Sequence, residues 1–320
     1  MMTRRQAVLT MVLATLLWSM AGIVTRQVEH AQGLTLTFWR STFNALALVV
    51  VLCVWRSPKG LWAGLRTGGW ALWASGLCWA TMYTAFMWAL TMTTVANVLV
   101  TMALGPLITA LLARWALGQR LTWPSVVAIV VAGLGLLLMQ APALWAQWSS
   151  SVGAPALQAP EGLADSSRHG WGLLLALAVP LAGAFNWVLI RASADRAQAN
   201  QGQPPDFLLS VLIGAVLSAV ASGLASEPLQ ASGADLGWLA LLGVFQLAIP
   251  CLLAVLAARV LPPSEVSLLS LLEVVFGVAW VWLGTAEQPQ TAVVIGGFVV
   301  LATLLVHEAW NLRRHRQSGE

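Results

Sequence analysis

The chain consists of long apolar runs separated by short polar segments. Ten runs have the length that an α-helix needs to cross a bilayer, about 20 residues at 1.5 Å per residue. They cover residues 7–25, 34–55, 70–90, 94–117, 123–145, 171–190, 207–225, 237–258, 266–283 and 291–310. The pattern therefore predicts an all-α integral membrane protein with ten transmembrane helices.

One connection is longer than the others. Residues 146–170 are rich in Ser, Pro, Gly and Ala, a composition typical of a flexible loop on the outer face. The loop separates five spans in residues 1–145 from five spans in residues 171–311, and a basic tail follows at 312–320. The first run follows Arg4 and Arg5 as in a signal peptide. However, it is longer than the apolar core of a signal peptide and lacks a clear cleavage site, so we interpret it as a span.

Composition agrees with a bilayer environment. Of the 320 residues, 59% are hydrophobic and only 9% are charged, whereas a soluble domain carries about 25% charged residues. This composition excludes a soluble enzyme, a disordered protein and a disulfide-rich secreted module. Cys53, Cys78 and Cys251 lie in apolar runs without metal-ligand spacing, and we interpret them as small core residues.

Basic residues predict the orientation. With the N-terminus in the cytoplasm, 13 of the 16 basic residues fall in cytoplasmic segments, namely Arg4, Arg5, Arg56, Lys59, Arg66, Arg114, Arg120, Arg191, Arg196, Arg259, Arg313, Arg314 and Arg316. Only Arg26 and Arg168 fall outside, and Arg40 lies within a span. This bias favours both termini inside, in the plasma (cell inner) membrane. Nine Trp residues near span ends are predicted interfacial anchors: Trp55, Trp62, Trp70, Trp123, Trp145, Trp148, Trp171, Trp238 and Trp310.

The two halves match at a nearly constant offset. Ala89–Leu90 matches Ala257–Ala258, Gly105–Pro106 matches Glu273–Val274, and Gln119 matches Glu287, each 168 residues further on. Because each half has an odd number of spans, the second half must enter the membrane inverted. Inverted repeats of this kind are typical of secondary transporters, whose substrate site lies near the midplane.

The motifs resemble those of the drug/metabolite transporter superfamily, in its EamA-type branch. The resemblance is carried by Phe38–Trp39–Arg40, TTVAN, LGPLITALL and GQRLT in the first half. AARVLPPSEVSLLSLLEVVFGVAW and GTAEQPQTAVVIGG carry it in the second half. It covers almost the whole chain and implies two EamA repeats that move small metabolites, often amino acids. It favours export but does not supply the substrate.

Two ionisable residues lie deep in predicted spans, where charge is costly. Glu273 is nine residues beyond Ser264, near which span nine enters at the inner face, and so lies about 14 Å in. We expect it to contact a substrate amine or couple protons, and the alternative is a structural carboxyl between helices. Arg40 either attracts an anionic substrate group or snorkels to the outer headgroups.

Uncharged polar residues at depth are further candidates. Trp18, Tyr83, Gln246 and Glu273 could share one level and line a pocket, in which an aromatic wall and a carboxylate would suit an amine or amino acid. Asn97 and Asn186 are also candidate substrate-binding residues, although polar side chains commonly bridge helices. Pro106, Pro180 and Pro250 interrupt spans four, six and eight, either as gate pivots or as packing curvature. Gly133, Gly135, Gly296 and Gly297 are expected to allow close helix contact.

Other chemistry finds no support in the sequence. The four His residues form no metal-ligand or triad spacing, and no Gly-Lys-Thr/Ser phosphate loop is present, so we expect no catalytic residues, metal or cofactor. We predict a secondary transporter of a small polar or amphipathic metabolite of the amino acid or organic cation type. Its partners would be that substrate and the lipid bilayer, without nucleic acid, and we expect a monomer. The alternatives are a membrane-embedded enzyme and a non-transporting sensor or assembly protein.

Overall fold

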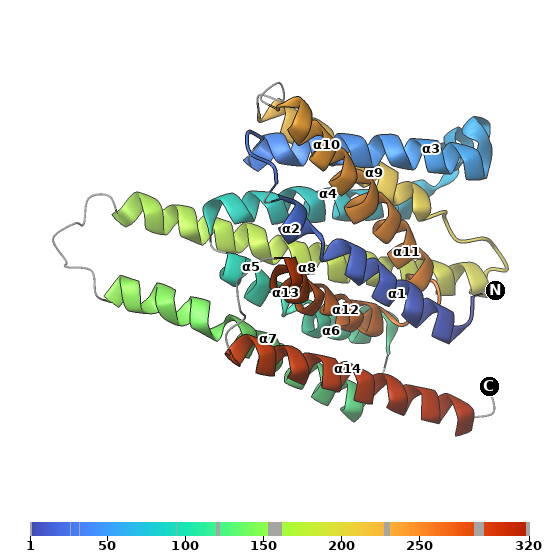
Figure 1. Ribbon diagram of the computed structural model, residues 1–320. Coiled ribbons are helices and arrows are strands. Elements are labelled where there is room, and N and C mark those ends of the chain that lie inside the picture. Colours follow the sequence, from blue (N-terminus) through green and yellow to red (C-terminus); the bar gives the residue numbers. More distant parts are fainter. Residues whose placement is uncertain are drawn as a thin grey trace.

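The computed structural model describes residues 2–25, 27–31, 33–93, 95–119, 122–152, 162–226, 231–284 and 291–317. Every regular element in these ranges is helical. The elements are α1 (Arg4–Trp18), α2 (Ala21–Thr25), α3 (Gly33–Thr67), α4 (Gly69–Met92), α5 (Val95–Met102), α6 (Gly105–Leu117), α7 (Trp123–Val152), α8 (Gly162–Ala199), α9 (Leu208–Leu224), α10 (Gly233–Leu241), the π-helix η1 (Leu242–Ala248), α11 (Ile249–Ala258), α12 (Pro263–Ser270), α13 (Leu272–Gly284) and α14 (Thr291–Gln317). Together they form an elongated bundle (Figure 1).

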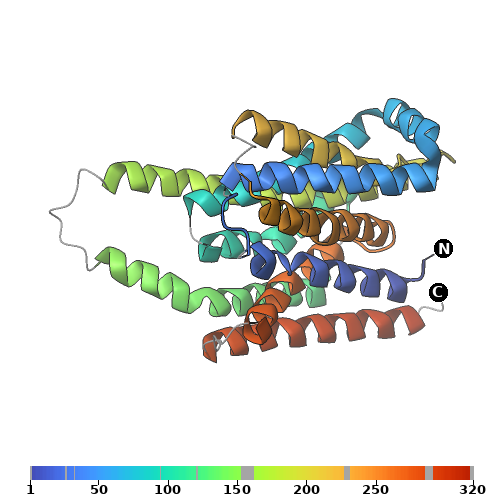
Figure 2. The ribbon, with the colours of Figure 1, turned by 45° about the horizontal axis from the view of Figure 1, so that its top comes forward.

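Each predicted apolar run is occupied by helix. Within the described residues, six helical stretches are long and apolar enough to cross a membrane: Arg4–Thr25, Gly33–Thr67, Asn97–Leu117, Gly170–Ala199, Gly233–Ala258 and Pro263–Trp280. Shorter apolar helices cover Trp123–Met139, Leu208–Leu224 and Thr291–His307. The start of α1 and the end of α14 lie at the same end of the bundle (Figures 1 and 2), as an even number of crossings requires.

Three of the ten runs are broken helices. The first run divides into α1 and α2, the fourth into α5 and α6, and the ninth into α12 and α13. The breaks of the fourth and ninth runs, at Ala103 and Leu271, are again 168 residues apart. The offset of 168 residues therefore relates two helix breaks as well as the sequence motifs.

Helices of the first half pack on helices of the second half, and each such contact has an equivalent with the two halves interchanged. α4 packs on α8 as α11 packs on α1, and α6 packs on α8 as α12 packs on α1. α3 packs on α9, and α7 packs on α14, so each of these pairs joins equivalent spans of the two halves. This exchange is what a pseudo-twofold relation between two five-span units produces.

The segment predicted as a long loop is shorter in the structure. Helix α7 continues to Val152 and α8 begins at Gly162, so much of residues 146–170 is helical. The middle of the segment, 153–161, lies outside the described residues. Both helices extend past the others at the end opposite the termini (Figure 1). Ser, Ala and Gly at these positions continue an established helix, which their loop-like composition did not reveal.

The nine predicted anchor tryptophans are all exposed on the outside of the bundle. Trp115, which was not among them, is the most exposed at 84%. Trp79 and Trp187, which lie deeper in the sequence pattern, are buried. Exposed Trp at helix ends and buried Trp at mid-length are the distribution expected when lipid surrounds the bundle.

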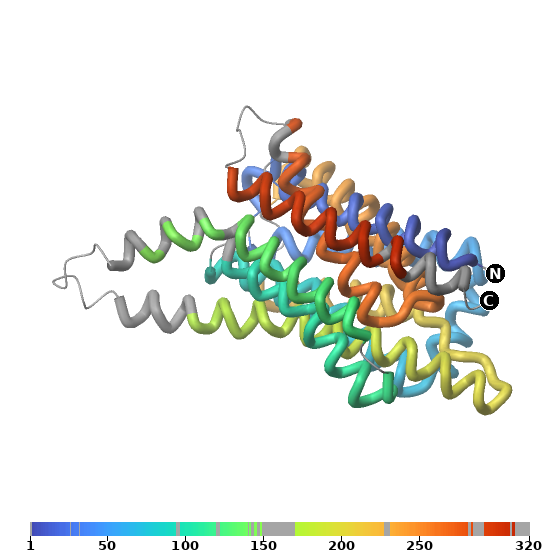
Figure 3. The backbone as a smooth tube through the Cα atoms, turned by 90° about the horizontal axis from the view of Figure 1, so that it is seen from below, coloured from blue at the N-terminus to red at the C-terminus, as the bar shows by residue number. Residues whose placement is uncertain are grey.

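Helices α7 and α14 lie side by side (Figure 3) and approach closely at two glycines. A Cβ added to Gly135 would come within 3.0 Å of the Gly296 carbonyl oxygen and 2.9 Å of Val300. Gly133, two residues earlier, has no heavy atom within 4 Å of such a Cβ. The predicted close contact is thus confirmed for Gly135 and Gly296, whereas Gly133 faces open space.

This difference between neighbouring glycines predicts opposite effects of one substitution. Gly135→Ala should destabilise the α7–α14 contact by about 1–3 kcal/mol, because the added methyl group overpacks it. Gly133→Ala should leave stability unchanged or raised, because alanine favours helix. The melting temperature of detergent-purified protein measures both effects. Equal melting temperatures for the two variants would contradict the packing described.

Candidate functional site

The helix breaks in the first, fourth and ninth spans lie around one pocket at mid-depth of the bundle. Its cavity volume is about 150 Å³, and its lining includes Trp18 at the end of α1, Ala103 and Gly105 at the α5–α6 break, and Leu271 and Glu273 at the α12–α13 break. A cavity of this size accepts one small organic molecule. The pocket therefore lies where backbone polar groups of three spans leave regular helix geometry.

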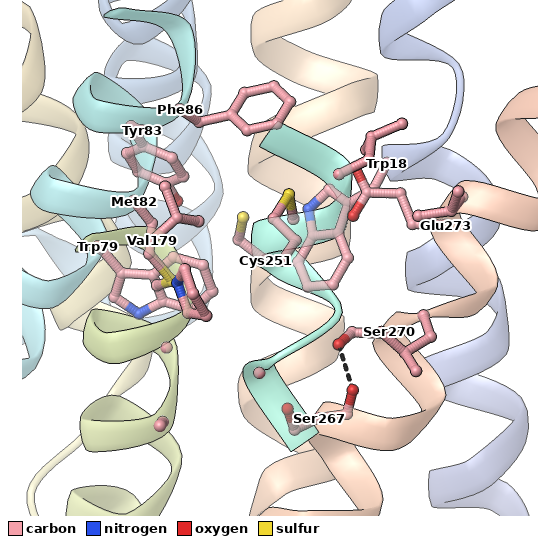
Figure 4. A pocket seen from close by; sticks show the side chains of 18 of the residues that line it. Trp18, Trp79, Met82, Tyr83, Phe86, Val179, Cys251, Ser267, Ser270 and Glu273 are labelled. Atoms are coloured by element: carbon pink, nitrogen blue, oxygen red, sulfur yellow. Dashed lines mark hydrogen bonds between the residues drawn. The ribbon is translucent and has the colours of Figure 1, made fainter. Parts of the chain in front are cut away.

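Aromatic side chains form one wall of the pocket. Trp79, Tyr83 and Phe86 project from α4, and Trp18 with Glu273 lies across the opening (Figure 4). The Trp79 ring meets the edge of Trp187 from α8, with centroids 5.6 Å apart, and lies 5.6 Å from the Tyr83 ring. This wall offers a large apolar surface that could also attract a cation.

Gln246 connects the pocket to the break in the first span. It lies in the π-helix η1, and such π segments occur frequently at functional sites. Its Nε2 donates to the Trp18 carbonyl oxygen at 3.3 Å, which is freed where α1 ends. Its Oε1 is buried without a hydrogen-bond partner among the described residues. The Gln246 amide nitrogen thus provides a hydrogen bond to a carbonyl oxygen at the helix break, and the amide oxygen remains as an unused acceptor among the described residues.

Two opposite charges share the pocket. Arg40 on α3 is 3% exposed, and its Nη2 donates to the Tyr83 carbonyl oxygen at 3.4 Å. Its Nε has no hydrogen-bond partner among the described residues. Glu273, at the start of α13, is half-buried and lies across the pocket from Trp79 and Tyr83 (Figure 4). Arg40 does not snorkel to the surface in this arrangement, because its guanidinium is held inside the bundle.

Five of the seven predicted binding residues line the pocket: Trp18, Arg40, Tyr83, Gln246 and Glu273. The other two lie elsewhere. Asn97 donates from Nδ2 to Thr93 Oγ1 at 3.0 Å, one helical turn away. Asn186 Oδ1 accepts from Ser75 Oγ at 2.6 Å, within a buried cluster that includes Ser210. These two asparagines bond to neighbouring side chains because their helices turn them away from the cavity.

The prolines differ in position. Pro180 lies inside α8 and lines the pocket. Pro106 lies in the first turn of α6, directly after the break between α5 and α6, and Pro250 follows the π-helix η1 inside the continuous helical stretch Gly233–Ala258. Neither of these two prolines lines the pocket. A role for the three prolines as gate pivots stays a prediction.

Most of the aromatic and small residues of the wall were not predicted from the sequence. Trp79, Met82, Tyr83 and Phe86 follow one face of α4 at helical spacing, as do Pro180, Gly183, Ala184 and Trp187 on α8. Extending this spacing from Tyr83 and from Pro180 would have found both sets. Cys251, read as a core residue, also lines the cavity.

Ion pairs gather at the end of the bundle that carries the termini. Arg4 Nη2 lies 2.9 Å from Glu265 Oε2 and so joins the starts of α1 and α12. The Asp206 carboxylate forms ion pairs with Nη2 of Arg56 at 2.8 Å and with Nη2 of Arg259 at 2.9 Å. At the opposite end, the Asp235 carboxylate accepts the backbone N–H groups of residues 29–31.

On the side of the pocket nearest the termini, α12 packs on α6 and α8. A Cβ on Gly105 would lie 3.4 Å from Ser267 Oγ and 3.7 Å from Pro180. The opposite half-helices, α5 and α13, have at most a weak contact with each other within the described part of the chain. The fourth and ninth spans are thus packed more closely on one side of the pocket than on the other.

A family model for the EamA-like transporter family matches residues 5–140 and again residues 170–307. The chain belongs to the EamA-like transporter family. The double match confirms the two repeats inferred from the sequence offsets, and with the apolar helices it identifies a multi-pass membrane transporter of the drug/metabolite type.

A solved crystal structure, described only as that of a protein, has the same fold as this EamA-like chain. The TM-score is 0.73 at 19% sequence identity, over 95% of this chain and 98% of the other. No curated protein matches the sequence. Within the described residues, no group of three His, Cys, Asp or Glu residues is placed to hold a metal ion.

Proposed function

We propose that this EamA-like protein is a secondary transporter with ten spans in two inverted repeats. It moves a small polar or amphipathic metabolite, of the amino acid or organic cation type, across the plasma membrane, with both termini in the cytoplasm. The observation that carries the proposal is the mid-depth pocket at three broken helices, next to which the fourth and ninth spans pack closely on one side. Export is the direction that the family resemblance favours.

The proposed alternating access uses the division of the fourth span into α5 and α6 and of the ninth span into α12 and α13. In this conformation the halves nearest the termini, α6 and α12, are packed on each other. In the opposite conformation α5 and α13 would close and α6 and α12 would part. Because the halves are related by the repeat, the two conformations use equivalent contacts.

A membrane-embedded enzyme would need clustered reactive groups, and a sensor would need no two-sided pocket. The pocket contains one carboxylate, from α13, and one guanidinium, from α3, an arrangement suited to binding rather than to nucleophilic or metal chemistry. Transport is therefore the function that the site supports best.

Glu273→Gln should abolish transport or remove its dependence on pH, because the amide keeps the shape of the side chain but can neither bind a cation as strongly nor carry a proton. Uptake and release of radiolabelled amino acids and organic amines by proteoliposomes measures this. Asp195→Asn is a matched control, since Asp195 pairs with Arg191 on the surface of α8. Full, pH-unchanged flux by Glu273→Gln would contradict the coupling role.

Glu265→Gln should loosen the closed side, because Arg4 then loses a partly buried ion pair between α1 and α12. A loss of about 1 kcal/mol would raise the population open toward the termini about fivefold. A cysteine at Ser267, which faces Gly105 in the closed contact, reports this opening. Membrane-impermeant thiol reagents should label it faster in inside-out vesicles of Glu265→Gln than of Asp195→Asn. Equal labelling rates would show that the ion pair is not a gate.

A further inference from the structure

A short amphipathic helix ends the α3 segment, at the end of the bundle that carries the termini. Ser57 has φ 62° and ψ 156°, so residues 58–67 form a separate helix that turns out of line with the rest of α3 (Figure 2). Ser57 Oγ accepts the Gly60 N–H at 3.3 Å, and Pro58 follows Ser57, as at an ordinary helix start. A helix of this length extends about 15 Å, which is too short to cross a bilayer.

One face of this short helix packs on the bundle. Leu61 and Leu65 are half-buried against the core, and Gly64 lies beside them at the start of α9. A Cβ on Gly64 would lie 2.6 Å from Leu209 Cδ1, so the missing side chain permits the close approach. Because these positions are three and four residues apart, they form one side of a helix. The packing therefore determines which side chains the helix turns outward.

The opposite face carries two cations and an indole ring. Lys59, Trp62, Ala63 and Arg66 are all exposed, and the last three lie three, four and seven residues after Lys59. Trp62 is 57% exposed, and the Arg66 guanidinium carbon lies 4.9 Å from the centroid of its ring. A cation–π contact orients the guanidinium and leaves its N–H groups available for hydrogen bonds to an anion. Such a pair can bind a phosphate in two-point fashion.

No carboxylate in the described part of the chain forms an ion pair with Lys59 or Arg66. The sequence contains no Asp or Glu between Glu29 and Glu161, so a partner would have to come from a distant segment. Asp206, at the start of α9, already pairs with both Arg56 and Arg259. The outer face of the short helix is thus a local excess of positive charge.

Tryptophans surround the short helix on the outside of the bundle. Trp55, Trp62, Trp70 and Trp73 are each more than half exposed. Exposed Trp in membrane proteins gathers at the level of the lipid headgroups, where the ring contacts acyl chains and its N–H meets water. Amphipathic helices with Lys and Arg on the polar face lie in the same layer. At this level the neighbours of Lys59 and Arg66 are lipid phosphates.

We propose that Lys59 and Arg66, together with Trp62, form a binding site for the headgroup of an anionic phospholipid. The lipid phosphate pairs with the two side chains, and the indole ring lies against the upper part of the acyl chains. A zwitterionic lipid would bring its own ammonium group next to the two cations and so binds less well. One basic side chain at an anionic membrane surface favours the anionic lipid by about fivefold. The bound lipid anchors the end of α3, the helix that carries Arg40.

Fluorescence quenching at the outer face measures this preference. Ala63→Cys, in a background with the native cysteines replaced by serine, carries a bimane label in protein reconstituted into mixed bilayers. Either phosphatidylglycerol or phosphatidylcholine carries a nitroxide near the top of one acyl chain. We expect a relative binding constant of about fivefold or more in favour of phosphatidylglycerol. High salt should reduce this preference, because it screens exposed charges.

Two double variants with the same change in net charge distinguish a site from general attraction. Lys59→Gln with Arg66→Gln should bring the two lipids to within about twofold of each other. Arg114→Gln with Arg196→Gln removes two exposed cations near the ends of α6 and α8 and should keep the preference. Size-exclusion profiles establish that each variant is folded. If the first double variant is not, the quenching with native Lys59 and Arg66 decides the proposal.

Three results would overturn the proposal. Equal quenching by the two lipids would show that the face does not select charge. An equal loss of preference in both double variants would show attraction by total charge only. Quenching by neither lipid would place residue 63 in water, where a soluble partner and not a lipid would meet this face. Since the bilayers contain no transported solute, none of these results bears on the proposed transport function.

Discussion

The structure depends on how backbone polar groups are satisfied where no water reaches them. In lipid, a helix can break only where protein or a water-filled cavity supplies partners for the freed groups. In the first span, Ser19 Oγ donates to the Leu16 carbonyl oxygen and Gln246 donates to that of Trp18. In the ninth span, Ser270 Oγ donates to the carbonyl oxygen of Ser267. These bonds permit breaks at mid-depth, and the breaks create the pocket.

A broken helix also divides mechanically into two halves. Each half can pack or separate on its own side of the membrane while the centre remains fixed. In this EamA-like protein the halves nearest the termini are packed, and an ion pair from Arg4 to Glu265 joins them further. The constraint that places the pocket at mid-depth is therefore also the one on which the proposed alternating access depends.

Sequence patterns predicted the runs, the repeat and the anchors because each depends on a local property. Apolar length predicts a span whatever its neighbours are, and Trp55 or Trp123 at a span end is typical of the interface. The depth of Glu273 followed from counting residues from Ser264. These inferences needed no knowledge of which helices touch.

The rest depended on helix rotation and neighbours. Asn186 is a buried amide like Gln246, yet it bonds to Ser75 and does not line the cavity. The breaks were hidden because Ser19 and Leu271 do not disfavour helix as proline does. The helical ends of α7 and α8 within the predicted loop came from continuation of long helices, which composition does not record.

Paired spin labels test the central claim most directly, that the two sides of the broken spans move reciprocally about a fixed pocket. With the native cysteines replaced by serine, one pair joins Val100 on α5 to Ala279 on α13, and the other joins Ala116 on α6 to Ser264 on α12. Electron–electron distance measurements in nanodiscs should give two populations for each pair. Conditions that shorten the α5–α13 distance should lengthen the α6–α12 distance. Distances that change in the same direction, or a single fixed distance for both pairs in protein that supports flux, would contradict the account.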